Sequence, residues 1–361
     1  MNDIKLSICI AVYNQSDLVK ECIKSILSYK GDDIEIIIGD DCSTENIREI
    51  ADSYKDKRIR FHCNEHNLGH DLNILSMLKE CRANYAFVLR SRDKLFGYCI
   101  PQIIECIGEH TNGSVFLFSA KDENGNNVLE FSDVEYEKGK ESAKAHTKLF
   151  IHPSGIVFRV DGINFELIEK YLKKYFNNHY GFVVHELVRM ELVDEGSFIT
   201  SSQTVWQYTQ KKTDVAVNSS RDHKSVYAPE YQYPRYCCEF EFAIKELGEN
   251  GKRIIPSYLV KRFYKSIAFD FLYENANLES QKHYDFSPIT FSKKEERARF
   301  REYSENMFNQ FLDLYQTKKF IRLIDYETIL HLAWYPIKHK MVAFCLARKN
   351  ASEIVKKYKM I

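Results

Sequence analysis

The chain lacks the features that mark membrane-spanning, zinc-binding and nucleic-acid-binding proteins. Its 361 residues contain no apolar run near the roughly 20 residues that a membrane-spanning helix requires. Ten cysteines are scattered without a C-x-x-C pair, which argues against a structural zinc site. Lys+Arg and Asp+Glu both number 51, so no net charge favours nucleic acid as a partner. The first residues, Met1 to Lys5, show no signal-peptide pattern, and the sequence as a whole predicts a protein of the reducing cytoplasm.

Two regions of different character follow one another along the chain. Hydrophobic residues make up 44% of the sequence, enough for a sizeable core. Residues 1–220 alternate between apolar strands and amphipathic helices, which predicts an α/β domain with a parallel sheet. From about Tyr227 long amphipathic segments dominate and no glycine follows Gly251, so we expect 221–361 to form a helical region.

The expected elements of the first region follow from hydrophobic periodicity and from capping residues. Ser16 and Ser43 are placed to cap the first two helices, and a third helix should follow the loop 64–70. The expected strands are 6–12, 34–39, 59–63, 85–89, 115–120 and 155–159, and the later helices are 166–175 and 183–193.

The stretch from Leu6 to Ser43 is the most informative part of the sequence. A buried strand ends in Ala11-Val12-Tyr13-Asn14, a helix follows, and a second strand runs directly into Asp40-Asp41. Ligands of open parallel sheets bind outside the carboxyl ends of the strands. A strand–helix–strand unit that closes on a carboxylate pair therefore predicts a nucleotide site. No G-x-G-x-x-G follows the first strand, which leaves a dinucleotide-dependent oxidoreductase as a weaker alternative.

Several motifs together resemble the family 2 glycosyltransferases of the GT-A fold, in particular those that assemble bacterial surface polysaccharides. The resemblance is dense up to about residue 95, sparse to about residue 210, and then ends. It is carried by residues 7–14 (SICIAVYN), residues 35–44 (EIIIGDDCST), and Asn67-Leu68-Gly69 with Asn73.

The resemblance implies a nucleotide-diphosphate sugar, such as a UDP-sugar, as the glycosyl donor. Tyr13 would then lie near the base, and Asp41 would accept the imide hydrogen of uracil. The alternative for Asp40-Asp41 is a turn pair that caps the next helix, and each residue could serve one of the two purposes. The residues expected to contact the nucleotide are Ala11, Tyr13, Asn14, Asp41, Asn73, Arg90, Arg92 and Asp93.

The sequence departs from the family after the fourth expected strand. The family places an aspartate-rich motif there, whose carboxylates hold Mn²⁺ or Mg²⁺ against the diphosphate. Here the segment reads Arg90-Ser91-Arg92-Asp93, so only Asp93 is left as a metal ligand and we expect a divalent cation to matter less. Arginine binds phosphate well, which predicts that Arg90 and Arg92 replace the metal. The alternatives are that the substitutions abolished catalysis, or that both arginines are ordinary surface charges.

Two further segments match the family more loosely. Glu186 lies where the family carries its catalytic base, and a base is needed to deprotonate the acceptor hydroxyl. The alternative is an exposed helix glutamate that pairs with Arg189. His152-Pro153-Ser154-Gly155 resembles the acceptor-side segment of the family.

The resemblance as a whole predicts an inverting transfer of a sugar to a carbohydrate or lipid-linked acceptor, in bacterial polysaccharide or glycoconjugate synthesis. The competing hypothesis is a catalytically inactive subunit that binds a sugar nucleotide or glycan. The segment 334–361 is rich in lysine and arginine between apolar residues. It suits either a helix packed on the catalytic domain, which we favour, or a peripheral contact with the inner face of an anionic membrane.

Overall fold

The computed structural model describes residues 4–149, 152–176 and 182–209, and parts of 235–247. The chain divides into two compact units, Met1–Lys212 and Thr213–Ile361, and the fold and site below belong to the first. The expected helical region falls outside the described residues apart from short helical stretches in 235–247, and the basic segment 334–361 lies outside them entirely. Among the described residues, no helix is long and apolar enough to cross a membrane.

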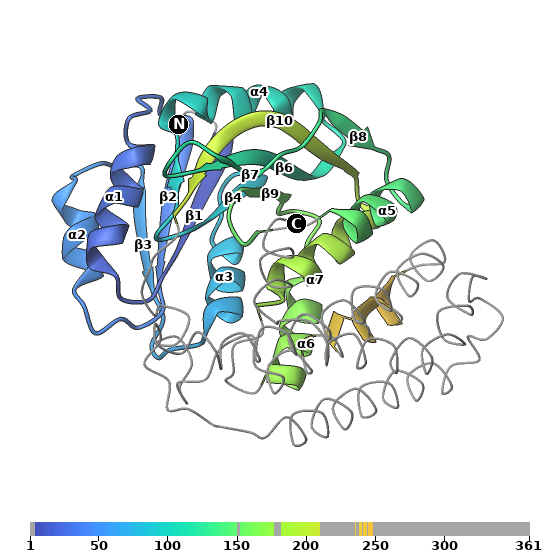
Figure 1. The fold of residues 1–361 in the computed structure, drawn as a ribbon. Helices are drawn as coiled ribbons and strands as arrows, with labels where there is room; N and C mark the ends of the chain where they lie inside the picture. The colour runs from blue at the N-terminus through green and yellow to red at the C-terminus, as the bar shows by residue number, and fades with distance from the viewer. Residues whose placement is uncertain are drawn as a thin grey trace, which may run out of the picture. The chain divides into compact units, whose positions relative to one another are not determined.

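Four parallel strands form one half of a mixed sheet, in the order β3-β2-β1-β4 (Figure 1). β1 and β2 are buried along nearly their whole length, which explains why their sequences are almost continuously apolar rather than alternating. The α/β fold class with parallel strands is confirmed. The elements of this half are β1 (Leu6–Val12), α1 (Ser16–Ile26), β2 (Ile34–Asp40), α2 (Ile47–Ser53), β3 (Ile59–Cys63), α3 (His70–Lys79) and β4 (Tyr85–Arg90).

The other half of the sheet is mixed in direction and continues in the order β9-β6-β10-β5. β9 lies antiparallel between β4 and β6, and β10 runs parallel to β6 with several bulges. The ends of β4, β6 and β10 therefore point to the same edge of the sheet. The elements are β5 (Lys94–Leu95), α4 (Ile100–Glu109), β6 (Gly113–Asp122), β7 (Asn127–Leu129), β8 (Val134–Tyr136), α5 (Lys140–Lys148), β9 (Ile156–Arg159), α6 (Phe165–Phe176), α7 (Val184–Glu191) and β10 (Ser197–Tyr208), with short 3₁₀ turns at Gly97–Cys99 and Leu192–Asp194.

Helices cover both faces of the sheet (Figure 1). Buried side chains of α1, α2 and α4 share one hydrophobic cluster with one face of β1, β2 and β4. On the other face, α3 contacts β1 and β2 and in turn packs against α6 and α7. Because period-2 alternation sends neighbouring residues to opposite faces, Ile8 and Ile10 belong to the first layer and Cys9 to the second.

The caps of the first two helices differ from the sequence prediction. α1 begins at Ser16, but its N-cap is Gln15 in the left-handed region (φ 67°), with no side-chain cap. The carboxylate of Glu45 instead accepts hydrogen bonds from the backbone N–H groups of Gln15 (3.2 Å) and Ser16 (2.7 Å). α2 is capped by Asn46, whose Oδ1 accepts from the N–H of Glu49 at 3.2 Å. Both serine caps are therefore wrong: a carboxylate from a distant loop satisfies the first helix end, and the adjacent Asn46 caps the second.

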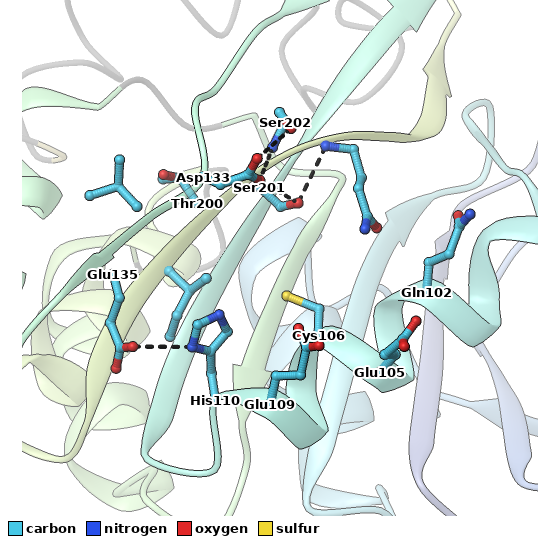
Figure 2. A pocket seen from close by; sticks show the side chains of 13 residues that line it. Gln102, Glu105, Cys106, Glu109, His110, Asp133, Glu135, Thr200, Ser201 and Ser202 are labelled. Atoms are coloured by element: carbon cyan, nitrogen blue, oxygen red, sulfur yellow. Dashed lines mark hydrogen bonds and ion pairs between the residues drawn. The ribbon is translucent and has the colours of Figure 1, made fainter.

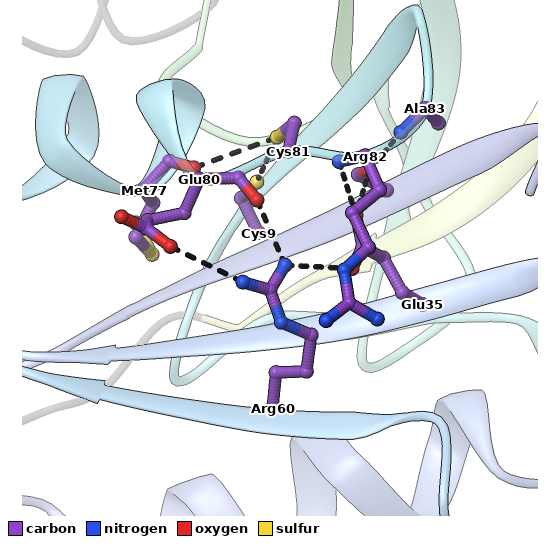
Figure 3. Close-up of polar contacts among 9 residues, drawn as sticks. Cys9, Glu35, Arg60, Met77, Glu80, Cys81, Arg82 and Ala83 are labelled. Atoms are coloured by element: carbon purple, nitrogen blue, oxygen red, sulfur yellow. Dashed lines mark hydrogen bonds and ion pairs between the residues drawn. The ribbon is translucent and has the colours of Figure 1, made fainter.

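A buried polar cluster lies at the opposite edge of the sheet, near the start of β1 and β2 (Figure 3). Glu35, 2% exposed, accepts hydrogen bonds from Ser7 Oγ (2.6 Å), the Arg82 N–H (2.6 Å) and an Arg60 Nη (2.8 Å). Such a carboxylate can stay buried because three donors, one of them a guanidinium, compensate its charge. This cluster lies at the amino edge of the sheet, away from the carboxyl edge where the motifs predict the nucleotide site.

Candidate functional site

The predicted nucleotide residues meet at the carboxyl edge of the sheet. Register pairs Val12 with Asp40 and Ala11 with Arg90, so the segments after β1, β2 and β4 leave the sheet side by side. The chain adds β2 and β3 on one side of β1 and then returns to place β4, also parallel, on the other side. The boundary between β1 and β4 is therefore the switch point at which ligands of open α/β sheets bind. Tyr13, half-buried, follows β1 at this point.

Asn14 ties the turn after β1 to the loop after β2. Its backbone is in the left-handed region (φ 58°), and its N–H donates to Ser43 Oγ at 2.6 Å. Its Oδ1 accepts from the backbone N–H and the hydroxyl of Thr44, at 2.9 and 3.1 Å. An asparagine tolerates this backbone conformation better than most residues. These contacts are with the protein, so a contact of Asn14 with the nucleotide stays a prediction.

The two neighbouring aspartates have different partners. Asp40 accepts from the N–H of Ser43 (3.1 Å) and from its hydroxyl, which makes it the turn residue. Asp41, 2% exposed, accepts from Asn64 Nδ2 (2.9 Å) and from the N–H groups of Leu68 (2.7 Å) and Gly69 (2.8 Å). A carboxylate offers about four acceptor positions, so three protein donors leave one for a ligand. The division of roles that the sequence suggests is present for Asp40, whereas the contact of Asp41 with uracil stays a prediction.

Asn73 supports the loop that Asp41 holds. Its side chain is 2% exposed, donates to the carbonyl of Gly39 at 2.9 Å and accepts from Asn64 Nδ2 at 3.1 Å. Its position at the start of α3 joins the end of β2 to the loop 64–69. The described contacts of its side chain are all with the protein.

Asp93 joins three segments at the carboxyl edge. It is fully buried and pairs bidentately with Arg90, through Nε at 2.7 Å and Nη2 at 3.0 Å. Ser154 Oγ donates to it at 2.5 Å and the N–H of Thr209 at 3.0 Å. The ends of β4 and β10 and the segment before β9 are thus bound to one carboxylate.

These contacts do not fit the divalent cation that the family implies. Four protein donors occupy the four acceptor positions of Asp93, and Arg90 balances its charge. A hard cation needs free carboxylate oxygens, and a guanidinium at 2.7 Å repels it. No group of three or more His, Cys, Asp or Glu side chains suited to a metal occurs among the described residues. The contacts of Asp93 therefore leave it unsuited to bind a divalent cation.

The arginines of this segment differ in their surroundings. Arg90 is half-buried, and its guanidinium carbon lies 5.4 Å above the ring of Tyr208. Its Nε and Nη2 are taken by Asp93, which leaves Nη1 facing away from that pair. Arg92 is half-buried as well. Arg90 is thus part of a rigid ion pair rather than an ordinary surface charge.

Aromatic rings line the same edge next to the arginines. The imidazole of His152 stacks on Trp206 (centroids 5.2 Å apart, 26° between planes) and meets Tyr208 edge to face at 5.2 Å. Trp206 is fully buried and donates to the carbonyl of Phe118 at 3.3 Å. A Cβ on Gly155 (φ 84°) would come within 2.0 Å of the Trp206 ring, so this approach requires glycine.

His152 is held in one orientation and in its neutral form. The N–H of Ser154 donates to its Nδ1 at 3.1 Å, so Nε2 carries the hydrogen. Burial lowers the pKa of His152 well below its ordinary value, and the charges of Arg90, Arg92 and His185 lower it further.

The start of α7 is anchored by a carboxylate on α3. Asp71 Oδ1 accepts from the N–H groups of Val183 (2.9 Å) and Val184 (3.0 Å), at the helix end that lacks intrahelical acceptors. Burial alone raises the pKa of Asp71, but the imidazole of His70 at 3.5 Å, the Val184 amide and His185 outweigh it, so the pKa lies below its ordinary value.

Glu186 lies in the first turn of α7 and is 1% exposed. Its Oε2 is 3.5 Å from an Nη atom of Arg189, which is itself buried and donates to Nδ1 and the carbonyl oxygen of His146. The pairing with Arg189 that the alternative interpretation expected is present, but the exposure it expected is wrong. The role of Glu186 as a base stays a prediction.

Residues 7–172 match the family model described as Glycosyl transferase family 2. This part of the chain is similar to glycosyltransferase family 2. A curated relative, the GalNAc(5)-diNAcBac-PP-undecaprenol beta-1,3-glucosyltransferase of Campylobacter jejuni, is 23% identical over 258 residues, which are 64% of this chain and 82% of the relative. Abequosyltransferase RfbV of Salmonella typhimurium is 32% identical over 95 residues, 25% of this chain and 28% of the relative.

A solved structure shares the fold of this chain. S. aureus TarS 1-349 in complex with UDP-GlcNAc superimposes with a TM-score of 0.58 at 17% identity, covering 92% of both chains. The GT-A fold is confirmed. The family match ends at residue 172, so α7 and β10, which carry Glu186, Trp206 and Tyr208, lie beyond it.

Sequence reasoning missed the part of the site that β10 contributes. β10 lies next to β6, which is two strands beyond β4, and runs parallel to it. Its end therefore brings Trp206, Tyr208 and Thr209 to the carboxyl edge. Asp71 was missed as well, although an acidic residue in the first turn of a helix is a common signal. Neither pairing could be read from spacing, because each bridges more than a hundred residues.

A separate cavity of about 480 Å³ lies between α4, β8 and β10 (Figure 2). None of the predicted nucleotide residues lines it. Its polar lining includes the pair of His110 and Glu135, 3.1 Å apart, and Asp133, which binds Ser201 and Ser202. The predicted donor site and this cavity are therefore distinct features.

Proposed function

We propose that this glycosyltransferase transfers a sugar from a UDP-sugar to a carbohydrate or lipid-linked acceptor, with inversion, in bacterial polysaccharide or glycoconjugate synthesis. The observation that carries the proposal is the convergence of Tyr13, Asp41, Arg90 and Arg92 at the switch point between β1 and β4. Two comparisons support it: TarS was solved with UDP-GlcNAc, and the Campylobacter relative is named for a lipid-linked acceptor.

Asp41 is the proposed uracil-reading residue. Its three protein donors hold the carboxylate in a fixed place and leave one acceptor position. A uracil imide N–H fits that position, whereas cytosine presents an acceptor nitrogen instead of a donor. Tyr13, at the end of β1, is the proposed neighbour of the base.

Arg90 and Arg92 are the proposed partners of the diphosphate. A leaving diphosphate gains negative charge, and guanidinium groups stabilise such charge with directed hydrogen bonds. The ion pair with Asp93 holds the Arg90 guanidinium in a fixed orientation, with Nη1 directed away from the pair. The substitution of arginine for the family's carboxylates and the saturated contacts of Asp93 support a reaction with a weak metal requirement.

Glu186 is the proposed general base. In an inverting transfer the acceptor oxygen attacks the anomeric carbon, its proton passes to the base, and the diphosphate departs with the bonding electrons. The position in the first turn of α7, which Asp71 anchors, supports the assignment. Its pairing with Arg189 favours the second candidate function, a binding subunit without a base.

Thermal unfolding with a panel of sugar nucleotides tests the donor. Ligands that bind only the folded state raise the melting temperature. We expect UDP-sugars to stabilise the protein more than the matching CDP-sugars, with nearly the same shift in EDTA as in Mn²⁺. Stabilisation by no nucleotide would contradict the proposal. A steep Mn²⁺ requirement that Asp93→Ala abolishes would contradict the role of the arginines.

A further inference from the structure

His152 presents an unused hydrogen-bond donor to the carboxyl edge. Its Nδ1 is occupied by the Ser154 N–H, and one face of the ring rests on Trp206. No described residue hydrogen-bonds its Nε2. The residue as a whole is half-buried. An imidazole fixed on three sides by the protein, with its one remaining polar atom open, is suited to a ligand rather than to the core.

The charges around His152 indicate what that ligand is. Arg90, at the end of β4, pairs with the carboxylate of Asp93, and Arg92 follows two residues later. The charges of both arginines and of His185 on α7 act on the ring. Arg92 and the Nη1 side of Arg90 favour an anion here, and the neutral ring still offers the Nε2–H to it. A second cation in place of the neutral imidazole would add repulsion to the free protein, whereas a neutral donor does not.

We propose that His152 contacts the sugar-nucleotide donor and that its Nε2–H donates a hydrogen bond to an oxygen of the diphosphate. This proposal rests on the donor proposed above and adds a residue to its phosphate subsite. The stack on Trp206, the bond from Ser154 and the edge contact with Tyr208 pre-orient the ring. Little rotamer freedom is then lost when the ligand binds.

The affinities for UDP and for uridine are compared, because the two ligands differ only in the diphosphate. A contact with the phosphates changes the affinity for UDP alone. His152→Phe keeps a ring on Trp206 and removes the donor, and His152→Gln replaces the ring with an amide that can reach the Nε2 position. We expect UDP affinity to fall about 10- to 150-fold in His152→Phe, as for one hydrogen bond to a charged group, while uridine affinity stays unchanged. His152→Gln should recover part of the UDP affinity. His110→Gln, beside the separate cavity, is the matched control and should change neither.

Nitrogen NMR of the wild-type protein measures the chemical shift of His152 Nε2. This shift would not respond to UDP if the ring had only a structural role. The Nε2 resonance of His152 should shift with UDP and not with uridine. Equal affinities of wild type and His152→Phe for UDP would overturn the proposal, as would a parallel loss for UDP and uridine. If His152→Phe does not fold, an Nε2 resonance that is unmoved at saturating UDP overturns it. A wild-type protein that binds no UDP overturns the proposed donor as well, so the two failures are distinguishable.

Discussion

At the scale of single residues, the site depends on buried carboxylates that bind several groups of the protein itself. Asp41 accepts three hydrogen bonds and Asp93 four, and both are buried. Sequence patterns identified both as important but could not show their partners, because the amides they bind lie in loops far along the chain. The motifs predict that these carboxylates contact a ligand, and the structure shows the groups of the protein that they bind.

Asp41→Ala should weaken UDP binding by about 1–3 kcal/mol, because it removes one ligand contact and loosens the loop that carries Leu68 and Gly69. Calorimetry measures the affinity. Asn64→Ala is the matched control, since it removes one partner of Asp41 and leaves the carboxylate in place. Equal losses in the two variants would assign Asp41 to the loop alone, and an unchanged affinity would remove it from the site.

Glu186→Gln should lower turnover by about 10²–10⁴-fold, the usual effect of removing a general base. Affinity for the sugar-nucleotide donor should persist, because a base touches the acceptor. Both quantities are measured in the same variant, with Glu166→Gln on the exposed face of α6 as the control. Retained turnover would exclude Glu186 as the base. Loss of both turnover and donor affinity would show that its pairing with Arg189 supports the fold instead.

At the scale of elements, close packing at the start of β9 sets the aromatic wall of the site. Gly155→Ala places a Cβ against the Trp206 ring in a left-handed backbone, so we expect it to destabilise the protein by at least about 2 kcal/mol. Denaturant unfolding measures this. Gly125→Ala is a matched control, because Gly125 has the same backbone conformation (φ 83°) with nothing within 4 Å of the added Cβ. Equal costs in both variants would show that backbone strain, and not Trp206, is responsible.

The anchor of α7 predicts a pH-dependent stability. The folded pKa of Asp71 lies below its unfolded value, so its stabilising contribution is present above about pH 4 and is lost as pH falls through the folded pKa. Asp71→Asn should cost about 1 kcal/mol at pH 7, as for a helix cap, and progressively less below pH 4. Urea unfolding of both proteins across pH 3–7 measures the difference. A difference that does not change with pH would contradict the role of the charge.

The elements that could be predicted from the sequence are those with local signals. β1 and β3 match their predicted ranges, and β2 and β4 are one residue longer. α4, α5, β8 and β10 were not predicted. β10 mixes serine, threonine and glutamine with its apolar residues because only part of it is buried, so its sequence lacks clear periodicity.

At the scale of the whole molecule, the parallel half of the sheet was predictable and the mixed half was not. Alternating strands and crossover helices determine the order β3-β2-β1-β4 through local connections. The insertion of β9 between β4 and β6, and the addition of β10 beyond β6, depend on pairings between distant segments. The strands that carry the predicted nucleotide residues could therefore be predicted from the sequence, whereas the aromatic wall beside them requires the structure.

The bond from the Thr209 amide to Asp93 makes one backbone hydrogen a reporter on the assembled site. Amide exchange occurs only when the local structure opens, and this amide is released only if β10 separates from the β4 end. We expect its exchange to be as slow as that of the β4 amides, to accelerate in Asp93→Asn, and to slow further with saturating UDP. Exchange as fast as in an open loop would show that the two halves of the site separate independently. If exchange is slow as expected, this single amide proton reports on the contact between three segments that are distant in sequence: the end of β4, the segment before β9 and the end of β10.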